Sequence, residues 1–224
     1  MTTRQLVLTV LGVLWLAGCT TVPFREVDLV SVEEFNPEEV RGRFAAALPV
    51  KFRMVNTVTF EFKRRAFSAI GYADVDTAAR TFTVVGFHPA GGIKLFELSG
   101  DSEDVDCRFA LEEFARWGDL AQAVAADTKG IYFDRIPSQD AKTWKGKYRI
   151  HFRQQAPDGE IEYVFAGADG LLVEKRYYEN GSRIWSASYY EYRRRDGKLY
   201  PGGIILEHHE YGYRLTVRLK EIRS

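Results

Sequence analysis

The sequence predicts an α+β fold in which a large, curled antiparallel sheet of about ten strands is covered by two or three helices. Two observations carry this prediction. Apolar and polar residues alternate along much of the chain, as in strands with one buried and one solvated face. Asp-Gly and Asn-Gly pairs, which are typical of tight hairpins, recur at regular spacing in the last third. An open sheet of this size curls or splits, so one face should be concave and apolar.

The N-terminus has the three regions of a secretory signal. Arg4 is followed by the apolar run Leu6–Leu16 and then by small residues. This run is shorter than the roughly 20 residues of a spanning helix. The tetrapeptide Leu16-Ala17-Gly18-Cys19 resembles the bacterial lipobox, in which the cysteine receives a diacylglyceryl group and the signal is cleaved before it. We therefore predict a lipoprotein signal peptide over residues 1–18 and lipidation of Cys19. An ordinary signal peptide, or an anchor, with an incidental cysteine is the alternative.

Lipidation would tether the protein to a membrane, because two or more acyl chains hold a protein stably. Enterobacterial lipoproteins that stay in the inner membrane carry Asp after the cysteine. Thr20 stands there, which implies the periplasmic face of the outer membrane. Cleavage removes only Arg4 among the charged residues and leaves 30 Lys and Arg against 31 Asp and Glu. This balance gives no electrostatic case for nucleic-acid binding. Cys107 is expected to be a buried, small apolar residue.

We expect residues 19–35 to be a lipidated tether and residues 36–224 to be the domain. The domain begins with a helix that Asn36 can cap and that Pro49 ends. Pro37 suits the first turn, and Glu39 completes a capping box. One apolar stripe on this helix, able to pack on a sheet, consists of Val40, Phe44 and Leu48.

Alternation of apolar and polar residues predicts four strands with short connections, over residues 57–63, Phe67–Asp74, Arg80–Phe87 and Ile93–Ser99. The next segment, Asp106–Ala126, lacks proline and has a broad apolar face that includes Phe114 and Trp117. We predict a helix there that covers the sheet as a lid. Residues 134–145 are predicted to be irregular or one short helix.

The last 80 or so residues predict a six-stranded meander, because successive tight hairpins force neighbouring strands to pair in antiparallel fashion. In the closing strand, three apolar residues face one side and Arg214, Thr216 and Arg218 face the other. The predicted strands are Lys147–Gln155, Glu160–Ala166, Leu171–Glu179, Ser182–Arg194, Leu199–Glu210 and Tyr213–Arg223.

The order of these elements resembles the LolA/LolB-like superfamily, which comprises periplasmic carriers and outer-membrane acceptors of lipoproteins. The segment Tyr200–Leu206, followed by Tyr213–Leu219, is similar to the last two strands of that family. The resemblance covers roughly residues 36–224. It implies an unclosed half-barrel under a helical lid, with the acyl chains of a lipid or lipoprotein held in the hollow. A periplasmic donor protein is the partner that it suggests.

Side chains that should face the concave side form the candidate ligand-binding set. They would bind acyl chains through apolar burial, and any one of them can instead be ordinary core. The set consists of Phe60, Phe62, Phe82, Val84, Phe114, Trp117, Tyr190, Leu206, Leu215, Val217 and Leu219.

The sequence contains no recognisable catalytic, metal or cofactor motif. His209–Tyr213 departs from a zinc-protease motif because Tyr213 replaces the second histidine on a segment that is not helical. His208 and His209 point to opposite sides of a strand. We predict a non-catalytic lipoprotein, without cofactor or metal, that binds acyl chains in envelope lipid or lipoprotein trafficking. The alternatives are a tethered scaffold protein with a fully packed core, and an acyl hydrolase with a Ser-His-acid cluster in the groove.

Two runs of basic residues, Lys63–Arg65 and Arg193–Arg195, lie at or beside predicted hairpin ends. Either run can contact phospholipid headgroups, or can be a solvated tip that blocks aggregation. The sequence leaves both interpretations open for both runs.

Overall fold

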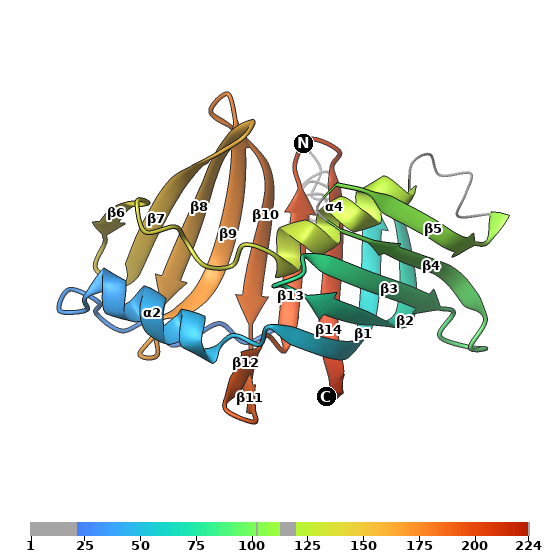
Figure 1. Ribbon diagram of the computed structural model, residues 1–224, viewed down its shortest axis with the longest axis horizontal. Helices are drawn as coiled ribbons and strands as arrows, with labels where there is room; N and C mark the ends of the chain where they lie inside the picture. The colour runs from blue at the N-terminus through green and yellow to red at the C-terminus, as the bar shows by residue number, and fades with distance from the viewer. Residues whose placement is uncertain (1–21, 102, 113–119, 224) are drawn as a thin grey trace, which may run out of the picture.

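The computed structural model describes residues 22–101, 103–112 and 120–223, which form a twelve-stranded antiparallel sheet with two helices (Figure 1). The strand order is β5-β4-β3-β2-β1-β14-β13-β10-β9-β8-β7-β6. Strands β5 and β6 end the sheet without pairing to each other, so within the described residues the sheet is not closed into a barrel. The predicted α+β class and the curled, unclosed sheet are therefore confirmed.

The helices are α2 (Pro37–Ala47) and α4 (Leu120–Tyr132). The first five strands are β1 (Lys51–Phe62), β2 (Arg65–Asp76), β3 (Thr81–Phe87), β4 (Lys94–Gly100) and β5 (Val105–Ala110). The later ones are β6 (Lys142–Lys145), β7 (Arg149–Ala156), β8 (Gly159–Ala166), β9 (Leu171–Glu179), β10 (Ser182–Tyr190), β13 (Gly203–His208) and β14 (Tyr213–Arg223). A separate small hairpin consists of β11 (Arg193–Arg195) and β12 (Lys198–Tyr200).

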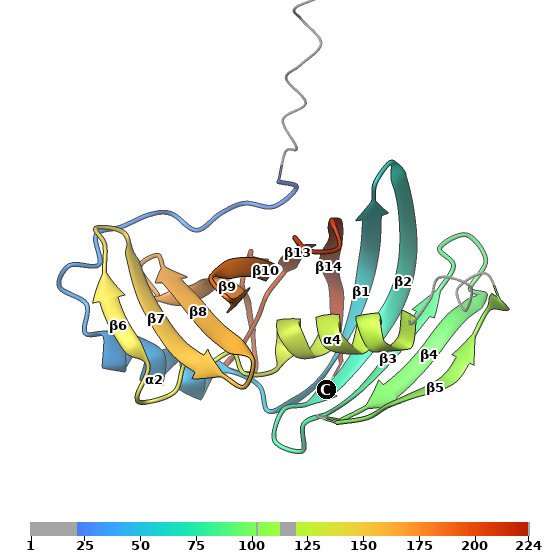
Figure 2. The same cartoon turned by 90° about the horizontal axis from the view of Figure 1, so that it is seen from above.

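The sheet bends into two lobes, with both helices on its concave side (Figure 2). We call β6–β10 with α2 the α2 lobe, and β1–β5 with α4 the α4 lobe. Strands β13 and β14 join the two lobes, because β13 pairs with β10 and β14 pairs with β1. The lobes thus belong to one continuous sheet and face the same side.

Helix α2 begins as predicted and closes the α2 lobe. Asn36 caps it by accepting a hydrogen bond from the amide of Glu38 at 2.9 Å. Val40 and Phe44 are buried, and the Phe44 ring meets the Phe165 ring edge-on with centroids 5.3 Å apart. The predicted apolar stripe therefore packs directly on the sheet.

Helix α4 crosses the concave side and is fixed at its C-terminal end. The buried Lys175 ammonium donates hydrogen bonds to the carbonyls of Gly130 at 3.2 Å and Phe133 at 2.8 Å. The Tyr189 hydroxyl donates to the carbonyl of Ile131 at 2.8 Å. These bonds satisfy carbonyls that a helix end leaves without a partner. Burial lowers the pKa of Lys175 to about 7, and the nearby Asp134 opposes this effect.

The predicted helix over Asp106–Ala126 is wrong at both ends. Residues 105–110 form β5, because the Asp101 side chain accepts from the amides of Glu103 and Asp104 at 2.8 and 3.0 Å and turns the chain back along β4. The helix instead continues beyond Ala126 to Tyr132. Cys107 lies on β5 and is exposed, contrary to the expected burial.

Two smaller predictions also need correction. Lys142–Lys145 is the edge strand β6, which pairs with β7, so the segment 134–145 holds a strand and no helix. The turn at Asp196-Gly197 closes the small β11–β12 hairpin outside the main sheet, and β10 pairs directly with β13. The remaining hairpins of the meander form as predicted.

Residues 22–35, the N-terminal strap, cross the outer, convex side of the sheet and then bend round its β6 edge toward α2 (Figure 2). Phe24 is buried against Gly203 and stacks on Tyr190 with ring centroids 5.4 Å apart. Further along, the Val32 amide donates to the carbonyl of Lys147 at 2.9 Å. Within the segment predicted to be a tether, Phe24 and Val32 are therefore buried against the domain, while most residues between them are exposed.

Candidate functional site

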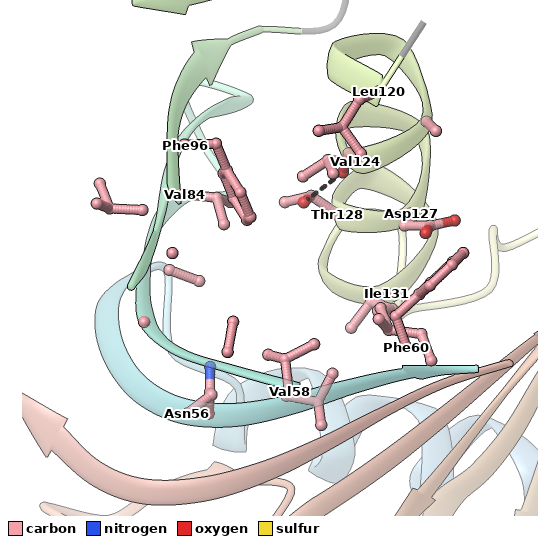
Figure 3. A pocket seen from close by; sticks show the side chains of 18 of the residues that line it. Asn56, Val58, Phe60, Val84, Phe96, Leu120, Val124, Asp127, Thr128 and Ile131 are labelled. Carbon is pink, nitrogen blue, oxygen red and sulfur yellow. Dashed lines mark hydrogen bonds between the residues drawn. The ribbon is translucent and has the colours of Figure 1, made fainter. Parts of the chain in front are cut away.

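An apolar cavity of about 350 Å³ lies between α4 and the inner face of the α4 lobe (Figure 3). Leu120, Val124 and Thr128 on the helix face Val84 and Phe96 across the open space. The other walls come from β1, β2 and β14. Their lining residues are Asn56, Val58, Phe60, Phe67, Ala69, Gly71, Ala73, Tyr213, Leu215 and Val217.

The cavity exists because three successive inward positions of β2 carry almost no side-chain volume. Ala69, Gly71 and Ala73 alternate along β2 and line the cavity. A Cβ atom at Gly71 would lie 2.0 Å from the carbonyl oxygen of Val85, so this position also requires glycine. A Cβ atom at Gly86 on β3 would lie 2.6 Å from the Phe96 ring. Small residues therefore leave a hollow that neighbouring side chains do not fill.

A few polar groups border the cavity, and most of them are already bonded. The Tyr213 hydroxyl donates a hydrogen bond to Asp127 Oδ1 at 2.6 Å. Burial raises the pKa of Asp127 to about 7, and the bond from Tyr213 partly opposes this rise. The Thr128 hydroxyl donates to the carbonyl of Val124 at 2.7 Å, so its proton is engaged within the helix. The space thus favours an apolar ligand.

The cavity contains part of the predicted ligand-binding set. Phe60, Val84, Leu215 and Val217 line it. Three other predicted residues, Phe82, Leu206 and Leu219, are buried in the core cluster. Phe62 stands at the end of β1, outside the lining. Cys19, Phe114 and Trp117 lie outside the described residues. A ligand-binding role stays a prediction for all of them.

Tyr190 was predicted to face the concave side and lies on the outer face instead. Its neighbour Tyr189 points toward α4, where its hydroxyl bonds to the Ile131 carbonyl. Successive side chains of a strand alternate between faces, so Tyr190 points away from the cavity, toward Phe24 of the strap.

The sequence analysis missed the floor of the cavity and most of its helical wall. The small inward residues Ala69 and Gly71 of β2 flank the large outward residue Ile70, which is a signal for a strand with an under-filled inner face. On α4, Leu120, Val124 and Thr128 recur every four residues, and this spacing was available in the sequence.

The described residues offer neither a hydrolase cluster in the cavity nor a metal site. Ser186 Oγ and His209 Nε2 are 3.2 Å apart, but both lie on the outer face of the sheet and not in the cavity. Within the described ranges, no carboxylate is hydrogen-bonded to His209. No group of three or more His, Cys, Asp or Glu side chains in this part of the chain could hold a metal ion.

Solved structures share this architecture. A LolA superfamily protein from Nitrosomonas europaea superimposes with a TM-score of 0.55 at 10% sequence identity, over 83% of this chain and 92% of that chain. A putative outer membrane lipoprotein-sorting protein domain from Vibrio parahaemolyticus gives a TM-score of 0.52 at 7% identity, over 83% and 90%. No protein-family model and no curated protein matches the sequence. The chain thus has the LolA-type fold that the resemblance predicted.

The described residues contain no helix that is both long enough and apolar enough to cross a membrane.

Proposed function

We propose that this protein is a lipid-anchored lipoprotein on the periplasmic face of the outer membrane that holds acyl chains of a lipid or lipoprotein in the α4-lobe cavity. The observation that carries the proposal is the cavity itself, about 350 Å³ of mainly apolar space under α4. This volume is within the range of small-molecule sites in proteins. The lipobox-like tetrapeptide ending at Cys19 supports the anchor.

Apolar burial supplies enough free energy for this role. Moving ten methylenes from water into the cavity would contribute about 8 kcal/mol before the costs of association are subtracted. No catalytic group is needed, and the protein is proposed to act without chemistry on its ligand. The lipoprotein-sorting domain of the same fold supports the choice of lipid or lipoprotein as cargo, with a periplasmic donor protein as the proposed partner.

A scaffold protein with a fully packed core was the alternative prediction. Its core would have to be solid beneath both helices, whereas the space beneath α4 is open. The hollow α4 lobe therefore favours a ligand-binding role.

The test is binding of a fluorescent fatty acid to the mature, unlipidated protein. Ala69→Leu places extra methylenes in the cavity and should weaken binding about tenfold or more, since each displaced methylene is worth about 0.8 kcal/mol. Ala66→Leu is the matched control, because Ala66 is exposed on the same strand and does not line the cavity. Equal loss in both variants, or no binding by the wild type across several lipid classes, would contradict the proposal.

A further inference from the structure

The tip of the β1–β2 hairpin carries three consecutive cations. Strands β1 and β2 are joined by a tight turn at Lys63-Arg64, and Phe62 pairs with Arg65 across it. Lys63, Arg64 and Arg65 are all exposed. No carboxylate in the described part of the chain lies within 4 Å of their charged groups, whereas arginines further down, such as Arg53 with Asp74, are paired. The tip is therefore a concentrated positive charge.

This tip extends to the same side of the molecule as the start of the N-terminal strap, away from α2 and α4 (Figure 2). The strap is fixed there by Arg218, whose guanidinium donates to the Pro23 carbonyl at 2.7 Å and lies 4.4 Å from the centroid of the Phe24 ring. Only five peptide units separate Phe24 from Cys19, a reach of at most about 17 Å. An anchor at Cys19 would hold this side of the protein close to the membrane.

The inner face of the same hairpin is a wall of the cavity. Phe60 and Phe67 line the cavity, and each stands two residues from the Phe62–Arg65 pair that closes the hairpin. Phe62 is half-buried beside them, and the Lys63 ammonium lies 4.9 Å from the centroid of its ring. The hairpin therefore links a basic tip to an apolar lining without interruption.

We propose that Lys63, Arg64 and Arg65 dock on the anionic phospholipid headgroups of the membrane that holds the anchor. This inference rests on the anchored lipoprotein of the proposed function. Docking places the wall of the cavity against the bilayer surface. An acyl chain then moves between bilayer and cavity along Phe62, Phe60 and Phe67, without crossing bulk water.

The charges at the other end of the molecule are balanced, unlike those of the hairpin tip. Four carboxylates lie along the strap where it crosses the α2 lobe: Glu26, Asp28, Glu33 and Glu34. Arg25 is paired with Asp28 at 3.3 Å, and the strap as a whole is acidic. The exposed cations Lys142, Lys145, Lys147 and Arg149 stand beside the strap and offset its carboxylates, so this end is close to neutral. The three cations of the hairpin tip, unpaired within the described residues, therefore attract an anionic surface more strongly, and the α4 lobe approaches the bilayer first.

The chain offers a matched control in the second basic run, Arg193–Arg195. It leaves the sheet between β10 and β13, at the strand ends opposite to Phe62, and forms the β11–β12 hairpin at the lower edge in Figure 1. Arg195 is already engaged by the Ile222 carbonyl and lies 3.7 Å from Asp196. Three positive charges can thus be removed from either of two separate surface hairpins, and the effects compared.

The experiment measures cosedimentation of the unlipidated chain, from residue 19 with Cys19→Ser, with vesicles of phosphatidylcholine alone or with 30 mol% phosphatidylglycerol. Lys63→Gln/Arg64→Gln/Arg65→Gln should lower partitioning onto anionic vesicles about tenfold or more. Arg193→Gln/Arg194→Gln/Arg195→Gln should change it less than about twofold. Binding to anionic vesicles should also fall when salt is raised from 0.1 to 0.5 M, because the shorter Debye length screens the charges.

Equal losses in the two triple variants, a loss only in the second, or equal binding of the wild type to neutral vesicles would overturn the inference. A second measurement separates it from the proposed function. Without vesicles, fluorescent fatty-acid affinity should be the same in the wild type and in the Lys63–Arg65 variant, while uptake from anionic vesicles should be slower in the variant. Failure of the wild type to bind fatty acid at all would instead remove the cavity function and leave the docking result standing.

Discussion

The two lobes of this protein are made from one sheet, yet one interior is solid and the other is hollow. In the α2 lobe, the inward positions carry large side chains that are fully buried, among them Phe152, Tyr163, Phe165 and Leu172. In the α4 lobe, three successive inward positions of β2 carry only Ala69, Gly71 and Ala73. Both lobes have one helix on the concave side. The difference lies in side-chain volume and not in architecture.

The two covering helices also differ in the size of the side chains that they turn toward the sheet. Helix α2 inserts Phe44 between Phe165 and Tyr192, with ring centroids 5.3 and 6.2 Å away. Along most of its length, helix α4 presents Leu120, Val124 and Thr128 to its lobe, all of them smaller than phenylalanine, and its lining aromatic Tyr132 stands at its C-terminal end. Since packed protein interiors leave few voids larger than a water molecule, a hollow of this size requires small residues on both sides. Curling of the sheet alone does not create it.

The largest expected difference between the lobes is the cost of removing a phenyl ring. Phe165→Ala should lower the free energy of unfolding by about 4 kcal/mol, because the ring is fully buried between Phe44 and Phe152 and leaves a closed void. Phe96→Ala should cost about 1–2 kcal/mol, because this ring borders a cavity that is already open. Urea denaturation of both variants measures the difference. Equal costs would mean that the α4 lobe is as solid as the α2 lobe in solution.

Much of the fold could be predicted because its signals are local. The Asn36 cap, the Asp-Gly and Asn-Gly turns and the strand alternation each act within a few residues, and the structure contains the corresponding elements. The order of strands then follows from short hairpins. The helix predicted over Asp106–Ala126 was wrong at its start because the composition of the segment suits a helix. The strand β5 forms there instead because the turn at Asp101 brings the chain back to pair with β4.

The cavity was harder to predict because it depends on positions that lack a large side chain. Phe60, Val84, Leu215 and Val217 could be placed on the concave face from alternation, and they line the cavity. Phe82, Leu206 and Leu219 share that face but pack into the core, which only the tertiary arrangement decides. A search for large apolar residues also passes over Gly71, although the absence of a side chain there makes room for a ligand.

A smaller contrast between the lobes should appear when volume is added. Ala187→Leu should lower stability by about 2 kcal/mol, because Ala187 is fully buried in the α2 lobe and has no room for three more carbons. Ala69→Leu in the cavity should change stability by less than about 0.5 kcal/mol, since the added carbons enter open space. Thermal and urea unfolding measure both variants. A loss at Ala69 as large as that at Ala187 would show that the cavity closes in the free protein.

The expected effect that depends on pH concerns the carboxyl group of Asp127 at the cavity. Burial raises its pKa to about 7 from the ordinary value of 3.8. Between about pH 4 and 7 the folded protein keeps a proton that the unfolded chain has lost, so stability falls as the pH rises through this window. The contribution of the neutral form is complete below pH 4 and is lost above about pH 7. Asp127→Asn keeps an acceptor for the Tyr213 hydroxyl and removes the titration.

The Asp127→Asn variant should therefore match the wild type near pH 4 and exceed it by as much as about 4 kcal/mol at pH 8, because a pKa raised from 3.8 to about 7 corresponds to about three units at about 1.4 kcal/mol each. Urea unfolding across the pH range measures the difference. Tyr213→Phe is the control for the hydrogen bond, because it removes the donor and leaves the carboxyl group to titrate. A difference between wild type and Asp127→Asn that does not change with pH would mean that water reaches this carboxylate freely. The α4-lobe cavity would then be open to solvent at Asp127, unlike the sealed interior beneath α2.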